Sequence, residues 1–345
     1  MMTVYKVDPL RDERWVAFLE RHPGASVFHT PGWLEALRRT YGYESHVSTT
    51  SAPREDLRNG LVCCRIHSWL TGRRLVSLPF SDHCEPLVGG EEELASLLSS
   101  LKSHLHRKEY VELRPRLQVG ALAGSEIGRT FCFHLLDLRP SLETLYRNFH
   151  KDCVQRKIRR AEREGLTYEE GATETLLSQF YELMVQTRRR QLLPPQPIAW
   201  FRNLIVCTGK SLKIRLVYKH NQPVASILTL RYKDTLVYKY GCSDKAFSNL
   251  GGMHLLFWRA IQEAKGDGLE KFDLGRSDLD NPGLIDFKDR WGAQRSVLTY
   301  YRYGMSALTK ASPAGWKVRF AKYAFARLPS FMLVSAGRLL YRHIG

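Results

Sequence analysis

The sequence predicts an α/β (α+β) protein built from two similar units in tandem, followed by a basic helical tail. Two observations carry this prediction. The chain has 345 residues, and one domain typically takes about 100 to 200. Segments with helical and strand periodicity follow one another in a similar order in both halves, although the letters do not repeat. We therefore expect a first domain over residues 1–140, a second over 141–303 and the tail over 304–345.

The second unit has the clearer pattern of elements. Apolar residues recur at helical spacing from Leu142 to Ala161, with Ser141 placed to cap the helix and Gly165 to end it. A second helix over 175–192 is ended by two prolines. The remaining predicted elements are an antiparallel meander of strands at 212–218, 223–232 and 235–241, a helix at 251–268, a strand at 270–275, a short helix at 283–292 and a strand at 296–303.

The first unit repeats much of this order. Its predicted elements are helices at 11–22 and 30–41, strands at 45–50, 60–67 and 74–80, a helix at 91–108, and strands at 110–117 and 130–138. The seam between the two units is expected near Arg139 and Pro140.

Composition indicates anionic partners and an intracellular location. The 52 Lys+Arg against 35 Asp+Glu give a formal charge of +17, which favours nucleic acid, phosphorylated small molecules or an anionic membrane face without choosing among them. The seven cysteines contain no C-x-x-C pair, so we expect reduced thiols and neither a zinc framework nor a disulfide scaffold. No apolar run approaches the roughly 18 residues that span a bilayer. We expect a cytoplasmic protein.

The tail differs in composition from the rest of the chain. From Gly304 to Gly345 there is no Asp or Glu, and seven Lys+Arg are mixed with apolar residues. Such a segment is either a packed pair of helices or an anchor on the inner membrane face.

Gly251 and Gly252 open the helix predicted at 251–268. Glycines at a helix start let backbone N–H groups approach a phosphate closely, and the helix dipole favours its negative charge. The alternative is a tight turn between a strand and a helix, for which glycine is a common residue.

The order of elements and this glycine-entered helix resemble the GNAT acyltransferase superfamily. In that superfamily a splayed strand and the following helix N-terminus hold the pyrophosphate of an acyl-CoA. The stretch "FDLGRSDLDNPGLIDFKDRWGAQ" (272–294), together with "VYKYGCSD" (237–244) and "RKIRRAEREGL" (156–166), is similar to the second domain of the FemAB and BioF2-like acyltransferases. These are tandem GNAT-fold proteins that include the aminoacyl-tRNA-dependent enzymes building peptidoglycan bridges. The resemblance covers roughly residues 145–303 and implies two GNAT-like domains, each a mixed central sheet flanked by helices.

The resemblance implies a role for the lysine of the F-K pair. Lys288 would stabilise negative charge on the tetrahedral intermediate of acyl transfer, and Phe287 and Trp291 would shape the pocket wall. In the alternative interpretation Lys288 and Asp289 lie on a solvated helix face, and the two aromatics, four residues apart, belong to the core.

Four further residues are candidates for the site. Arg276 follows a strand end, where ligands commonly meet α/β sheets, and its guanidinium suits phosphate or carboxylate unless it pairs with a nearby aspartate. Tyr240 ends the meander and either donates a hydrogen bond or a proton to substrate, or packs half-buried. Arg156 and Arg160 belong to a basic helix face that is either solvated or binds a polyphosphate, a nucleotide sugar or tRNA.

The resemblance, taken with the basic charge and the tail, implies an acyltransferase that places an acyl or aminoacyl group on an amine or hydroxyl of a cell-envelope or exopolysaccharide precursor. We expect acyl-CoA or aminoacyl-tRNA as a co-substrate, no tightly bound cofactor and no metal. The expected partners are an anionic nucleotide- or lipid-linked saccharide, tRNA and the inner membrane surface, and no motif predicts sequence-specific DNA binding. The alternatives are an acyl-CoA-dependent N-acetyltransferase acting on a soluble sugar nucleotide or amine, and a non-catalytic RNA-binding or scaffold protein.

The sequence departs from both donor classes. No sustained heptad predicts the coiled-coil arm that many tRNA-dependent relatives carry, and the turn at Gly251 lacks the arginine and full glycine pattern of ordinary acetyl-CoA-binding GNAT proteins. The donor therefore stays open at this point, and no general base is identified.

Overall fold

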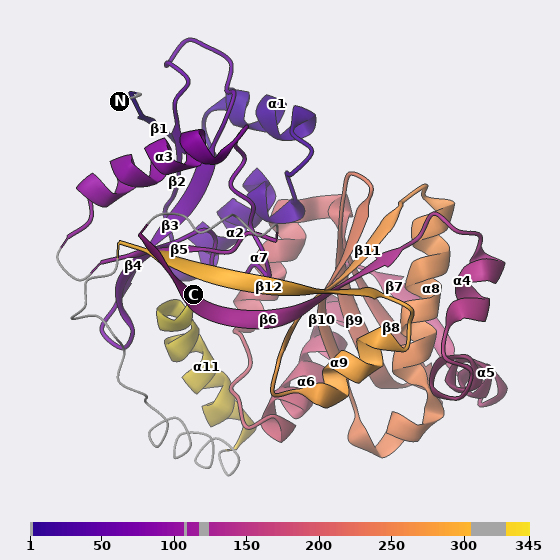
Figure 1. The fold of residues 1–345 in the computed structure, drawn as a ribbon. Coiled ribbons are helices and arrows are strands. Elements are labelled where there is room, and N and C mark those ends of the chain that lie inside the picture. The colour runs from indigo at the N-terminus through magenta and orange to yellow at the C-terminus, as the bar shows by residue number, and fades with distance from the viewer. Residues whose placement is uncertain (1–2, 107–108, 117–123, 305–328) are drawn as a thin grey trace. The chain divides into compact units, whose positions relative to one another are not determined.

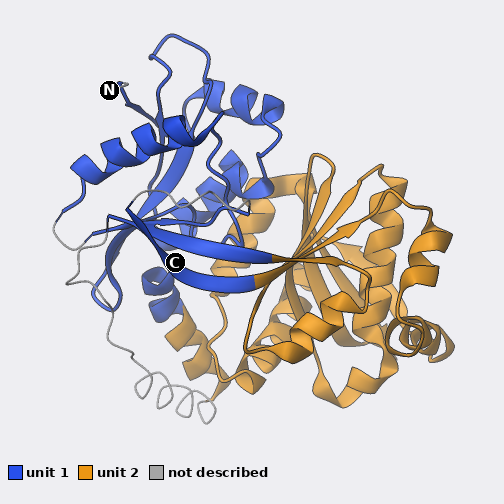
Figure 2. Cartoon of the chain, in the orientation of Figure 1, with its two compact units in different colours: residues 1–131, 297–314, 338–345 blue, residues 132–296, 315–337 orange. Residues whose placement is uncertain are grey.

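The computed structural model describes residues 3–106, 109–116, 124–304 and 329–345. The fold is mixed α/β, as predicted (Figure 1). It divides into two compact units, coloured separately in Figure 2. Unit 1 comprises residues 1–131, 297–314 and 338–345, and unit 2 comprises residues 132–296 and 315–337.

Unit 1 is a mixed sheet with three helices from the first part of the chain. Its sheet order is β1-β2-β3-β4-β5-β12-β6. The helices are α1 (Glu13–Arg21), α2 (Pro31–Tyr41) and α3 (Glu91–Ser103), and the strands are β1 (Tyr5–Val7), β2 (Ser45–Thr49), β3 (Leu61–Ser68), β4 (Gly72–Val76), β5 (Val111–Leu113), β6 (Ser125–Asp137) and β12 (Gln294–Tyr303). Strands β6 and β12 each have residues in both units.

Unit 2 continues from β6 in the order β6-β11-β10-β9-β8-β7. Strands β7 to β10 pair antiparallel in sequence order, which confirms the predicted meander, and β10 pairs parallel with β11. The helices are α4 (Leu142–Asn148), α5 (Arg156–Arg163), α6 (Glu174–Arg190), α7 (Ile198–Thr208), α8 (Gly252–Gly266) and α9 (Pro282–Asp289), and the strands are β7 (Thr167–Gly171), β8 (Leu212–Lys219), β9 (Gln222–Tyr232), β10 (Thr235–Ser243) and β11 (Lys271–Asp278).

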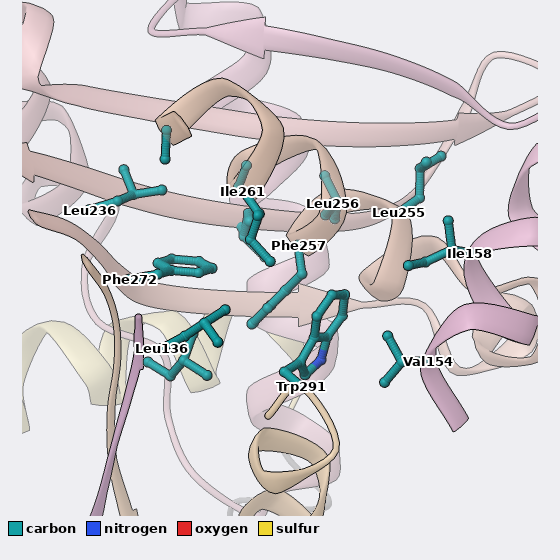
Figure 3. Close-up of a cluster of buried hydrophobic side chains, with 14 of the residues drawn as sticks. Leu136, Val154, Ile158, Leu236, Leu255, Leu256, Phe257, Ile261, Phe272 and Trp291 are labelled. Atoms are coloured by element: carbon teal, nitrogen blue, oxygen red, sulfur yellow. The ribbon is translucent and has the colours of Figure 1, made fainter. Parts of the chain in front are cut away.

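The core of unit 2 forms where α8 packs on the sheet. Figure 3 shows Phe257 of α8 between Phe272 of β11 and Trp291, and Leu255 of the same helix on the side of Ile158. The ring centroids of Phe257 and Trp291 are 5.3 Å apart at an interplanar angle of 30°. Helix α8 therefore holds the segment that follows α9 against the sheet.

The prediction of one helix from Leu142 to Ala161 was wrong. Phe149 adopts an extended conformation (φ −68°, ψ 145°) that ends α4, and a π-helical turn over Lys151–Gln155 precedes α5. The Gln155 side-chain amide donates to the carbonyls of Tyr146 at 3.0 Å and Phe149 at 2.9 Å. These bonds satisfy carbonyl groups that a helix end leaves unpaired, so they stabilise the break.

Strand β12 joins the sheet of unit 1. Residues Tyr301 and Tyr303 pair antiparallel with Leu113 and Val111 of β5, and from Val297 onward the strand belongs to unit 1. The sequence assigned this strand to the end of the second domain because it follows α9 directly.

The tail is described only from residue 329, and most of the segment 304–345 lies outside the described residues. Helix α11 (Ser330–Ile344) ends against unit 1, where the Tyr43 hydroxyl donates to the Arg342 carbonyl at 2.9 Å. Within the described part of the chain, no helix has the length and apolar character needed to cross a membrane.

Candidate active site

Strands β10 and β11 pair over only part of their length. The parallel register joins Thr235–Val237 to Lys271–Asp273, whereas the strands continue to Ser243 and Asp278. Within β11, Gly275 has a φ of +69°, and its N–H donates to the Asp273 carboxylate at 2.7 Å. Ligands of α/β sheets commonly bind at the carboxyl ends of such strands, so these two ends are where we place the candidate site.

A β-bulge separates the two tyrosines of β10. The register with β9 shifts between Tyr238 and Tyr240, and a bulge changes which face of the sheet the following side chain meets. Tyr238 packs on Phe257 of α8 at 4.8 Å between ring centroids. Tyr240 packs on Phe201 of α7 at 5.1 Å, although residues two apart in a regular strand share a face.

Tyr240 has a buried partner. It is 8% exposed, and its hydroxyl accepts a hydrogen bond from the Trp200 indole at 2.9 Å. The structure therefore gives Tyr240 the packed environment that was the alternative to a role in proton transfer. Tyr238, which the sequence analysis did not select, lies on the side of α8 and Trp291, and its hydroxyl occupies space that a side chain at Gly241 would need.

Helix α9 places Lys288 next to Gly275 of β11. The Asn281 side chain caps α9 by accepting from the N–H of Leu284 at 3.2 Å. Lys288, in the last turn, is 1% exposed, and its ammonium donates to the carbonyls of Gly275 at 2.9 Å and Arg276 at 3.0 Å. The interpretation of Lys288 as a solvated residue is wrong. Two backbone carbonyls thus hold the Lys288 side chain at the end of β11.

The aromatic residues around Lys288 belong to the core. Trp291 is fully buried, and its ring lies 4.9 Å from Phe149 and 6.0 Å from the His254 ring. Phe287 is partly buried against the same cluster. Both side chains thus pack in the core cluster beside α9, and their role as a pocket wall stays a prediction.

A buried histidine and an ion pair lie next to Lys288. His134 of β6 is fully buried, and its Nε2 lies 2.9 Å from Asp289 Oδ1. Burial lowers the pKa of His134 more than the hydrogen bond to Asp289 raises it. Burial raises the pKa of Asp289, but hydrogen bonds from Arg295 and His134 outweigh it, so the net pKa is lowered. A neutral His134 and an ionised Asp289 with Arg295 therefore flank the Lys288 segment.

Gly251 and Gly252 allow α8 to pack closely. Gly251 has a φ of +86°, and a Cβ there would lie 2.3 Å from the carbonyl oxygen of Lys157 on α5. A Cβ on Gly252 would lie 3.2 Å from Ala225 of β9. Both glycines thus have a packing role at the start of α8. Helix α5 packs against the turn at Gly251, where the sequence analysis predicted that a phosphate group binds.

Arg156 and Arg160 line a basic pocket on α5. Its volume is about 540 Å³, and it is lined by Arg156, Lys157, Arg160, Arg163 and Glu164. The ion pairs from Arg156 to Asp152 (3.9 Å) and from Arg160 to Glu164 (3.6 Å) are long and partly exposed, so they neutralise the pocket weakly. Lys157 lines this pocket, and its carbonyl is also the group that a side chain at Gly251 would meet. The basic helix face and the glycine turn, which the sequence analysis proposed separately as binding sites, therefore lie next to each other.

The sequence analysis missed His134 and Tyr238. His134 lies 155 residues from Asp289 in the chain, and no spacing rule links them. Arg276 is half-buried at the end of β11, and its carbonyl accepts from Lys288. The structure therefore brings Lys288 to the Arg276 carbonyl beside the core cluster that includes Phe287 and Trp291. Tyr240 packs on Phe201 of α7, and the basic pocket lies on α5.

Comparison with known proteins agrees with this fold. A family model described as an acetyltransferase (GNAT) domain matches residues 149–289. The crystal structure of FemX superposes with a TM-score of 0.69 at 16% identity, covering 88% of this chain and 97% of FemX. No curated protein sequence matches the chain.

Two further structures cover both units. The C-terminal domain (DUF2156) of a candidate lysylphosphatidylglycerol synthetase from Agrobacterium fabrum has a TM-score of 0.55 at 15% identity, over 95% of this chain and 96% of that one. A tandem GNAT protein from the clavulanic acid biosynthesis pathway has a TM-score of 0.52 at 10% identity, over 87% and 97%. A GNAT domain model thus matches residues 149–289, and the chain shares its fold with FemX and with the tandem GNAT protein, which confirms the predicted fold class and the resemblance.

Proposed function

Because the chain has the fold of FemX and contains an acetyltransferase (GNAT) domain, we propose that it is an acyltransferase. It transfers an acyl or aminoacyl group to an amine or hydroxyl of an anionic precursor of the cell envelope or of an exopolysaccharide. In this reaction the acceptor attacks the acyl carbonyl, an oxyanion forms, and the donor leaves as a thiol or a ribose hydroxyl. The protein must stabilise the oxyanion and hold both substrates.

The observation that carries the proposal is the buried ammonium of Lys288. It is fixed by two carbonyls at the end of β11, where the pairing with β10 has already ended. A cation in a water-poor site interacts strongly with charge that develops on a substrate. Lys288 in this role stabilises the oxyanion, and Arg276 on the same strand end binds a phosphate or carboxylate of a substrate.

The basic pocket on α5 supports an anionic substrate. Four cationic residues surround about 540 Å³ with one carboxylate, Glu164. Such a pocket suits the phosphate groups of a nucleotide- or lipid-linked saccharide, or those of tRNA. The close contact of Gly251 with Lys157 favours a donor other than acyl-CoA at the start of α8, because the α5 backbone already packs against this turn.

Ligand binding is the first test. Purified protein is screened by thermal shift against acetyl-CoA, charged and uncharged tRNA, and UDP-linked muropeptide. A ligand at a hundred times its dissociation constant stabilises the fold by about 2.7 kcal/mol. We expect stabilisation by charged tRNA or by the muropeptide. Stabilisation by acetyl-CoA alone would support the N-acetyltransferase alternative, and RNA binding without transfer would support the binding protein.

Matched variants connect binding to the pocket. Arg156→Ala with Arg160→Ala removes two pocket cations, and Arg159→Ala removes an exposed arginine of the same helix that does not line the pocket. The pocket variant should weaken binding at low salt, and Arg159→Ala should leave it unchanged. Equal effects of both would mean that α5 attracts anions only through its overall charge.

A further inference from the structure

The hairpin between β3 and β4 exposes two large apolar side chains at its tip. Trp69 is 77% exposed and Leu70 is 49% exposed. The tip is held in shape by the Ser68 hydroxyl, which accepts from the N–H groups of Leu70 at 3.1 Å and Thr71 at 2.9 Å. Trp69 is also held by its indole N–H, which donates to His343 Nε2 at 3.0 Å. The apolar ring is therefore presented to the surroundings by a fixed backbone and a fixed hydrogen bond.

The end of α11 lies against this hairpin. The Thr71 hydroxyl donates to the His343 carbonyl at 2.7 Å, and Arg74 donates to the Ile344 carbonyl at 3.0 Å. In this stretch α11 exposes Ile344 at 49% and, one helical turn before His343, Leu339 at 61%. Four exposed apolar residues thus come from two segments of unit 1 that are joined by hydrogen bonds.

Cationic residues accompany the apolar ones. Arg73 follows the hairpin tip, and Arg338 and Arg342 lie on α11; all three are exposed. The ion pairs found among the described residues include none of them. The sequence from Gly304 to Gly345 also contains no acidic residue. We name Trp69, Leu70, Leu339, Ile344 and these three arginines the hairpin patch.

We infer that the hairpin patch docks on an anionic lipid bilayer. Trp and Leu partition into the boundary between headgroups and acyl chains, where an indole keeps its polar N–H satisfied. Arginines beside them are attracted to anionic headgroups, with a contribution near fivefold in affinity for each, about 1 kcal/mol. The two effects act together, as stable peripheral binding requires. The inference rests on unit 1 alone and does not depend on the proposed acyl transfer.

Vesicle flotation with the full chain tests the inference. Vesicles of phosphatidylcholine mixed with phosphatidylglycerol should bind the protein, and vesicles of phosphatidylcholine alone should bind it much more weakly. Trp69→Ser with Leu70→Ser should weaken binding by at least about tenfold. Ile127→Ser, a matched change of an apolar side chain of β6 that is 71% exposed, should leave binding unchanged. Equal loss in both variants would overturn the inference.

Charge variants separate the two contributions. Arg338→Gln with Arg342→Gln should weaken binding by roughly fivefold for each arginine. Arg54→Gln, an exposed change in the connection at the other end of β3, should have no such effect. Binding that is indifferent to phosphatidylglycerol or to the two arginines would contradict the inference.

A spectroscopic readout covers the case in which the double variant folds poorly. Lipids brominated on their acyl chains should quench part of the tryptophan fluorescence of the wild-type protein. Trp69→Phe should still float with anionic vesicles but should lose this quenching. Quenching that persists would place another of the seven tryptophans in the bilayer and overturn the assignment to the hairpin patch. A concentration-dependent dimer that Trp69→Ser abolishes, without vesicle binding, would assign the patch to a second copy of the chain.

Discussion

The ammonium of Lys288 donates a hydrogen bond to the carbonyl oxygen of Gly275 at 2.9 Å, and this bond links α9 to β11. The lysine thus has a structural role whether or not it also acts on a substrate. Separating these two roles requires both a stability and a rate measurement.

Lys288→Met keeps a chain of similar length and removes the charge. We expect kcat of acyl transfer to fall by about 100-fold or more, as for loss of an oxyanion donor. The free energy of unfolding should also fall by about 1 to 3 kcal/mol, because the carbonyls of Gly275 and Arg276 lose a buried donor. Lys245→Met, at an exposed position, is the control for both measurements. Loss of stability with an unchanged kcat would assign Lys288 a structural role only.

Tyr240→Phe tests whether this tyrosine acts in catalysis. The change leaves the buried indole N–H of Trp200 without its acceptor, so urea unfolding should show a loss of about 1 to 2 kcal/mol. We expect kcat to stay within about twofold of wild type, because the hydroxyl is buried and already bonded to Trp200. Tyr238→Phe is the comparison on the other face of β10. A large fall in kcat for Tyr240→Phe alone would support its predicted catalytic role.

Gly251→Ala should destabilise unit 2. The added methyl group would meet the Lys157 carbonyl at 2.3 Å, and the backbone is in the left-handed region. We expect a loss of more than about 2 kcal/mol in the free energy of unfolding. Gly266→Ala, at the end of the same helix with nothing within 4 Å of the added carbon, should change stability by less than about 1 kcal/mol. Similar losses of stability at both positions would mean that the effect of Gly251→Ala does not come from its contact with α5.

The stability of the protein should depend on pH through histidines that are buried or partly buried. Burial, with a smaller effect of Lys157, lowers the pKa of His254 to about 4, from about 6.5 in an unfolded chain. As pH falls, the unfolded chain therefore binds a proton first. The contribution of His254 to the free energy of unfolding should be constant above about pH 6.5. It should decrease between about pH 6.5 and pH 4, by up to about 3 kcal/mol.

Urea unfolding across this pH range measures the effect. His254→Leu should flatten the dependence, and His67→Leu, at an exposed position of β3, should not. His29 and His46, whose pKa values burial also lowers to about 4, should keep part of the dependence in every variant. An unchanged slope in His254→Leu would show that this histidine does not titrate between the folded and unfolded states.

The elements with strong periodicity were predictable from the sequence. Helix α6 was expected at 175–192 and spans Glu174–Arg190, and the three strands of the meander lie where alternation placed them. The break after Asn148 was not predictable, because the apolar spacing continues through it and the stabilising bonds come from the Gln155 side chain. Strands β1 and β7 and helix α7 were missed. Strand β7 reads TYEEG and has no apolar face, and α7 combines buried aromatics with few polar positions.

The site was predictable only in part. The surroundings of Lys288 could be predicted because Gly275, the helix cap Asn281 and Trp291 all lie within one short segment of the sequence. The bulge that separates Tyr238 from Tyr240 depends on pairing with β9, and His134 meets Asp289 only through the tertiary fold. Contacts between segments that are distant in the chain cannot be predicted from the spacing of residues in the sequence.

The pairing of β12 with β5 sets an order for folding during synthesis. Tyr301 and Tyr303 leave the ribosome after all residues from 132 to 296, yet they complete the sheet that begins with the first residues of the chain. Until then one edge of β5 has no partner from β12, and an open strand edge is prone to pair with other chains. The N-terminal residues therefore keep this strand edge open until almost the whole chain has been made, whereas the central unit has most of its own strands and helices as soon as it emerges.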